Sequence, residues 1–289
     1  MIDRTLFNDE FFQALGGLTL PRRLRSGTDT GLHETNRLGE SLEFAELRPY
    51  QSGDDLRQVD WNAYRRFRRL LVRRYQAERS HDVYIVIDTS ASMAVPPNRF
   101  ARSKQIAGAI AVLAARRQDR VTLMSFSGAV DDLFVQSRRD RGALRLLERL
   151  SLMKASGTTD VAGCLTTAAD HIRRNSLLVL ISDFLAVPEA MEAALTVFER
   201  LSVQILFIQV TAREERDPVF RGDVLLEDSE TGQFYETRSR GRAIEAYRKR
   251  FQDHTALLSL HAAAHGGRLA AVNSENSLAA VLKEVLFPV

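Results

Sequence analysis

The residues with the clearest chemical potential are carboxylates and hydroxyls that follow apolar runs of the sequence. They stand in three separate segments: a D-x-S-x-S pattern, a Gly-Thr-Thr-Asp loop, and a single aspartate after a later apolar run. Carboxylate and hydroxyl oxygens are hard ligands, which suit Mg²⁺ or Mn²⁺ in octahedral coordination. Together the three segments offer two carboxylates and three hydroxyls to such a metal site.

The elements around these segments indicate how they could meet. From residue 81 onwards, apolar runs typical of buried strands alternate with segments of helical periodicity. This alternation predicts an α/β fold, with a doubly wound, mostly parallel sheet flanked by helices, and it brings the three segments to one edge of that sheet. Strands are expected at 83–88, 121–126, 177–182, 203–210 and 268–272, helices at 102–117, 141–151, 161–174, 188–201 and 241–264, and a hairpin at 224–239.

The first 80 residues have a different character from the rest of the chain. They are polar and rich in glycine, and their one long pattern runs from Leu47 to Glu78. Within it we expect a short helix at 56–67 and a strand at 70–76. The predicted organisation is therefore a small amino-terminal region, 1–80, joined to an α/β domain, 81–289.

Composition excludes several classes of protein. The 289 residues carry 40 basic and 37 acidic side chains, so the net charge is only +3 and does not by itself indicate nucleic-acid binding. A single cysteine, Cys164, excludes an internal disulfide and a thiolate-rich metal site. The amino terminus lacks the pattern of a secretory signal, and the longest apolar stretch, 106–115, is about half of what a membrane span needs. We therefore expect a cytoplasmic protein.

Common catalytic motifs are absent from the sequence. No lysine follows a glycine, so there is no phosphate-binding P-loop, and no G-x-G fingerprint for a dinucleotide occurs. The G-x-S-x-G nucleophile elbow is also missing. The chain does not look like an ATPase, a Rossmann dehydrogenase or a common hydrolase.

The three polar segments resemble the metal-ion-dependent adhesion site of von Willebrand factor type A domains. That resemblance implies a metal site whose five ligand positions are Asp88, Ser90, Ser92, Thr159 and Asp183. Family members usually read G-G-T-[DN] in the middle segment; here Thr158 replaces the second glycine, and Thr159 takes the threonine position. Asp160 is expected to be a helix-start acid rather than a ligand.

An upstream block narrows the resemblance. The sequence EFAELRPYQSGDDLRQVDWNAYRR (43–66), with LVRRYQAE (71–78), resembles the bacterial domain-of-unknown-function family 58. Members pair a short amino-terminal region with a von Willebrand type A domain and are commonly encoded beside MoxR-type AAA+ ATPases. The resemblance implies a protein-interaction module, not an enzyme, that binds a partner's carboxylate through Mg²⁺ or Mn²⁺. Its implied partners are a MoxR-type ATPase and a client protein.

Two other functions remain open from the sequence. A metal-dependent phosphohydrolase could use Asp88 and Asp183, although no general base or phosphate-gripping motif follows the strands. The cluster from Arg65 to Arg74 could contact nucleic acid, but the low net charge favours a solvated connection between elements.

Overall fold

The computed structural model divides the chain into two compact units. The larger unit comprises Met1–Thr28 and His81–Val289, and the smaller unit comprises Asp29–Ser80. The first 28 residues thus belong with the larger unit, and the division into a region 1–80 and a domain 81–289 stays a prediction. The residues that the structure describes are 2–21, 42–51, 54–55, 59–77, 81–128, 130–135, 142–185, 192–219, 222–239 and 241–287.

The larger unit is built on a six-stranded sheet with the order β10-β7-β6-β3-β4-β5. All neighbours pair in parallel except β5, which lies antiparallel at one edge. The expected doubly wound, mostly parallel sheet is therefore confirmed, and β5 is an addition to it. The bounds are β3 (Asp82–Asp88), β4 (Arg120–Phe126), β5 (Val130–Val135), β6 (Leu177–Ser182), β7 (Gln204–Thr211) and β10 (Arg268–Asn273).

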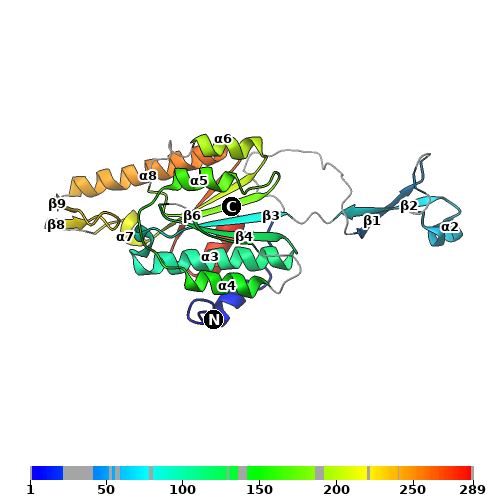
Figure 1. Cartoon of the computed structure of the whole chain (residues 1–289), viewed down its shortest axis with the longest axis horizontal. Coiled ribbons are helices and arrows are strands. Elements are labelled where there is room, and N and C mark those ends of the chain that lie inside the picture. Colours follow the sequence, from blue (N-terminus) through cyan, green and yellow to red (C-terminus); the bar gives the residue numbers. More distant parts are fainter. Residues whose placement is uncertain are drawn as a thin grey trace. The chain divides into compact units, whose positions relative to one another are not determined.

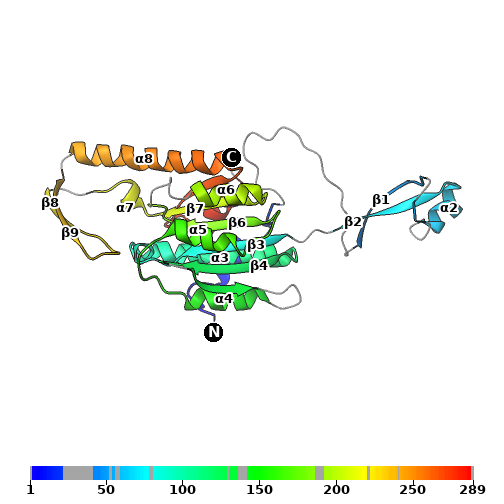
Figure 2. The ribbon, with the colours of Figure 1, turned by 45° about the horizontal axis from the view of Figure 1, so that its top comes forward.

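Helices cover both faces of this sheet (Figures 1 and 2). Ile85 and Ile87 of β3 belong to the core on one face, and Tyr84 and Val86 belong to the core on the other. Burial on both sides explains why β3 reads as a continuous apolar run rather than as an alternating one. One face carries α3 (Pro97–Arg116), α4 (Gly142–Leu152) and α9 (Leu278–Leu286); the other carries α5 (Val161–Ala169), α6 (Glu192–Arg200) and α8 (Gly241–Ala264).

Several helix boundaries differ from the expected ones. Helix α3 begins five residues earlier, because Pro97 fits the first helical turn, where no backbone N–H is needed. Helix α5 ends at Ala169 instead of 174, and the chain turns through Asn175 in a left-handed conformation before β6. The predicted start of α6 near residue 188 lies outside the described residues.

The amino-terminal segment packs into the core of the larger unit. Its short helix α1 (Asp9–Ala14) is capped by Asn8 and buries Phe11. Phe7, Leu15 and Leu20 join the same hydrophobic cluster as α3. This helix cannot be predicted from the sequence, because six residues are too few to show periodicity.

The smaller unit contains β1 (Leu42–Pro49) and β2 (Leu71–Ala77), which pair antiparallel, and α2 (Trp61–Phe67). The expected strand at 70–76 is confirmed as β2. Helix α2 starts later than predicted because the Asp60 carboxylate caps it, accepting the N–H groups of Asn62 and Ala63. In the arginine cluster, Arg65, Arg66, Arg68 and Arg69 are exposed, and the side chains of residues 73 and 74 lie outside the described set.

The remaining elements of the larger unit are α7 (Arg213–Arg216) and a hairpin of β8 (Gly222–Glu227) and β9 (Phe234–Ser239). The hairpin was expected at 224–239, and its strands pair from Gly222↔Ser239 to Glu227↔Phe234. Within the described part of the chain, no helix has both the length and the apolar character to span a membrane.

Candidate metal site

The candidate site lies where two neighbouring central strands end. Asp88 is the last residue of β3, and Asp183 directly follows β6, which pairs in parallel with β3. Both side chains are buried. Because parallel strands end at the same edge, the fold brings together these two residues, which are distant in the sequence.

The Asp88 carboxylate is held on both oxygens. Its Oδ1 accepts the backbone N–H of Ser90 at 2.9 Å, and its Oδ2 accepts the Ser182 hydroxyl at 2.6 Å. Burial raises the pKa of Asp88 to about 6, although these hydrogen bonds act in the opposite direction. The raised pKa means that the charged carboxylate is poorly solvated in this position, and a bound cation would relieve that.

Two hydroxyls stand next to Asp88. The Oγ atoms of Ser90 and Ser92 lie 3.0 Å apart; Ser90 directly precedes a short 3₁₀ helix (Ala91–Ala94), and Ser92 lies within it. Adjacent ligands of an octahedral cation with bonds of 2.0–2.1 Å lie about 2.9 Å apart. The separation of the two hydroxyls therefore suits neighbouring positions around Mg²⁺ or Mn²⁺.

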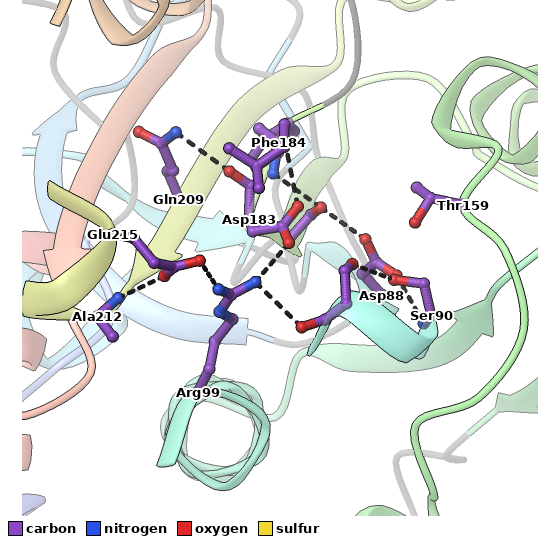
Figure 3. Close-up of polar contacts among 12 residues, drawn as sticks. Asp88, Ser90, Arg99, Thr159, Asp183, Phe184, Gln209, Ala212 and Glu215 are labelled. Carbon is purple, nitrogen blue, oxygen red and sulfur yellow. Dashed lines mark hydrogen bonds and ion pairs between the residues drawn. The ribbon is translucent and has the colours of Figure 1, made fainter. Parts of the chain in front are cut away.

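Asp183 forms an ion pair with a buried arginine that no sequence motif indicates. Nη1 of Arg99, on α3, lies 2.5 Å from Oδ2 of Asp183 and also donates to the carbonyl oxygen of Ser92 at 3.2 Å. The other terminal nitrogen of Arg99 pairs with Glu215 of α7 (Figure 3). Only 1% of Arg99 is exposed, and burial lowers its pKa while Asp183 counteracts that effect. No feature of the sequence distinguishes Arg99 from the other arginines.

Thr159 lies on a separate loop, which is joined to the D-x-S-x-S turn. The backbone joins this loop to the D-x-S-x-S turn, since Ser156 donates to the Thr89 carbonyl at 2.7 Å and Ala91 donates to the Gly157 carbonyl at 2.9 Å. Gly157 has a φ of +85°, a conformation that favours glycine. Asp160 caps helix α5 by accepting the N–H of Gly163, which confirms its expected role at a helix start.

Hydrogen bonds connect four of the five predicted ligands, directly or through Arg99, and Thr159 has a different partner. Hydrogen bonds link Asp88 to Ser90 and Ser90 to Ser92, and Arg99 links the Ser92 backbone to Asp183. The hydroxyl of Thr159, in contrast, donates to Glu230 of the β8–β9 hairpin. Figure 3 shows Thr159 on its own segment, across from Asp88 and Ser90.

The donor set fits a hard divalent cation. Among the described residues, no three His, Cys, Asp or Glu side chains gather closely enough to form a metal cluster by themselves. A cation at this edge would therefore depend on serine and threonine oxygens beside Asp88. Such a mixed set of one or two carboxylates with neutral oxygens and waters is typical of Mg²⁺.

Part of this chain is similar in sequence to known proteins. The family described as "Protein of unknown function DUF58" matches residues 46–259. An uncharacterised protein of Mycobacterium bovis is 29% identical over 201 residues, which cover 67% of this chain and 62% of that protein. The chain thus aligns with less than two thirds of this relative's length.

Two solved structures share a partial likeness. The conserved hypothetical protein BatB from Bacteroides thetaiotaomicron is 18% identical, with a TM-score of 0.40, over 71% of this chain and 97% of that one. The SpRpn10 VWA domain is 13% identical, with a TM-score of 0.39, over 71% of this chain and 95% of that one.

Proposed function

We propose that this chain, which belongs to the DUF58 family, is a protein-interaction module that binds an acidic side chain of a partner through a divalent cation. The observation that carries the proposal is the arrangement at the end of β3, where a buried carboxylate stands beside two hydroxyls 3.0 Å apart. Asp88, Ser90 and Ser92 would hold the ion, and Thr159 would complete the protein's own set.

The electrostatics support binding rather than catalysis. Asp88 is the one predicted ligand whose carboxylate has no basic side chain bonded to it among the described contacts, whereas Asp183 is paired with Arg99. A divalent cation that is bound by only one or two anionic ligands keeps uncompensated positive charge. That charge attracts a further carboxylate. When bound, the cation supplies this attraction, and the residues of the chain fix its position.

The same pairing weakens the case for a phosphohydrolase. Such an enzyme needs a cationic side chain free to grip the phosphate. Arg99 is buried and already bonded to Asp183 and Glu215. We therefore favour a non-enzymatic role; binding of nucleic acid by the arginines of the smaller unit stays a separate prediction.

The partner that we propose is a MoxR-type AAA+ ATPase, with a client protein as a possible third component. This part of the proposal depends on the resemblance of residues 43–78 to the family, whose members are commonly encoded beside such ATPases. The exposed acidic residue that enters the site would belong to one of these partners.

The proposal is tested by measuring binding between the full chain and the MoxR-type ATPase of the same genome by biolayer interferometry. Binding is expected in Mg²⁺, and it should be lost both in EDTA and in an Asp88→Asn variant. A Glu214→Gln variant, which removes a charge from α7 but not from the site, should bind like the wild type. Binding that persists in EDTA would contradict a metal-dependent interaction.

A further inference from the structure

Thr159, one of the predicted ligands, is already bonded to a carboxylate of the chain itself. Glu230 accepts two hydrogen bonds from Thr159: Oε2 from the backbone N–H at 3.0 Å and Oε1 from the hydroxyl at 2.5 Å. The two residues are 71 positions apart in the sequence, so the tertiary fold creates this contact. Both oxygens of this carboxylate are therefore bonded to a predicted ligand, on a loop that backbone hydrogen bonds join to the turn after Asp88.

The turn of the hairpin holds Glu230 in place. Oδ1 of Asp228 accepts the N–H groups of Glu230 at 2.9 Å and of Thr231 at 3.0 Å. The backbone of Asp228 also bonds to Gly232 and Gln233, at 2.8 Å in each case. These bonds fix the turn between β8 and β9 and direct the Glu230 side chain to the Thr159 loop.

The apolar side chains of the hairpin that the structure describes bury little surface. Leu225, Phe234 and Tyr235 are each more than half exposed, and Leu226 is 42% exposed. Burial of apolar surface is the dominant stabilising contribution in most tertiary contacts, and these side chains provide little of it. Release of Glu230 from Thr159 would therefore require few other contacts to break.

We propose that Glu230 is an internal ligand of the metal site, occupying the place that a partner's carboxylate would take. The inference rests on the proposed function, because it assigns a role to Glu230 only if the site binds a cation. An internal carboxylate has a high effective concentration, so it competes strongly with an acidic residue from another protein. The β8–β9 hairpin thus keeps the site closed until a partner displaces Glu230.

The test compares Mn²⁺ binding by the full-length wild type and a Glu230→Ala variant. Isothermal titration gives the affinity, and enhancement of water-proton relaxation by bound Mn²⁺ reports the number of exchanging waters on the ion. A Glu227→Ala variant is the matched control, since it removes an equally charged side chain from the same hairpin. Acetate, against chloride at equal ionic strength, serves as the external carboxylate.

The Glu230→Ala variant is expected to bind Mn²⁺ about tenfold more weakly than the wild type and to show a higher water relaxation enhancement. Acetate should reduce that enhancement in the variant and leave the wild type and Glu227→Ala unchanged. Equal affinity and equal enhancement in the wild type and Glu230→Ala would overturn this inference and leave the proposed function standing. If the wild type fails to bind Mn²⁺, the proposed function fails, and the inference fails with it.

Discussion

Asp88 combines burial with a negative charge, and this combination has a measurable effect on stability. The folded pKa of about 6 lies above the ordinary value of 3.8, so between these values the folded protein binds more protons than the unfolded chain. Stability of the metal-free protein therefore falls as the pH rises from 4 to 6. Above pH 6 the charged carboxylate lowers the free energy of unfolding by about 3 kcal/mol, at 1.36 kcal/mol for each pKa unit.

An Asp88→Asn variant removes this charge and keeps an oxygen that can accept the hydrogen bond from the Ser90 backbone N–H. In EDTA at pH 7.5, its free energy of unfolding should exceed that of the wild type by up to ~3 kcal/mol, and the difference should vanish near pH 4. Urea unfolding at the two pH values measures it. A variant that is no more stable than the wild type at pH 7.5 would show that Asp88 is better solvated than its surroundings indicate.

Arg99 is the second residue whose removal should be informative. An Arg99→Met variant leaves Asp183 and Glu215 without their buried cation, so we expect a loss of about 3–5 kcal/mol in the free energy of unfolding. Arg248→Met is the control, because the pair of Arg248 with Asp217 is exposed and its loss should change stability by under ~1 kcal/mol. Similar small losses in both variants would show that Arg99 has no structural role.

Asp88 and Arg99 differ in how far the sequence indicates that they lie at the site. Asp88, Ser90 and Ser92 could be predicted because they share one short segment directly after a strand. Arg99 and Glu230 could not, since their relation to the site depends on how α3, α7 and the hairpin pack. No local spacing connects position 230 with position 159.

Among the helices and strands, those that are long or buried are the ones that the sequence predicts. The central strands and long helices have apolar runs or periodicity that a sequence displays directly, and the predicted elements match the structure apart from shifts of up to five residues at their ends. The edge strand β5 contains two consecutive acidic residues, Asp131 and Asp132, and therefore lacks an apolar pattern. Helix α1 is short, and its apolar residues are recognisable as core only when α3 is beside them.

The packing of the amino-terminal segment on α3 depends on Gly108. A side chain at this position would start 2.7 Å from Phe7 Cε1 and 2.8 Å from Leu147 Cδ2, and both neighbours are buried. We expect Gly108→Val to lower the free energy of unfolding by about 2 kcal/mol, measured by urea unfolding. The control Ala115→Val, on a less buried part of the same helix, should cost under ~0.7 kcal/mol. Equal effects would show that the segment is not packed against α3.

At the scale of the molecule, every predicted ligand lies in the larger unit, as do Arg99 and Glu230. The smaller unit carries the other part of the family match, including Trp61, whose side chain is 57% exposed. Metal binding is therefore expected to be a property of the larger unit. The smaller unit provides a separate surface whose role the site does not determine.

The central claim is that this edge of the sheet binds a divalent cation, and isothermal titration of Mg²⁺ and Mn²⁺ into the metal-free full chain tests it most directly. We expect saturable binding by the wild type and by a Trp61→Ala control, and no binding by the folded Asp88→Asn variant. The absence of binding by folded wild-type protein, or unchanged binding by Asp88→Asn, would contradict the claim.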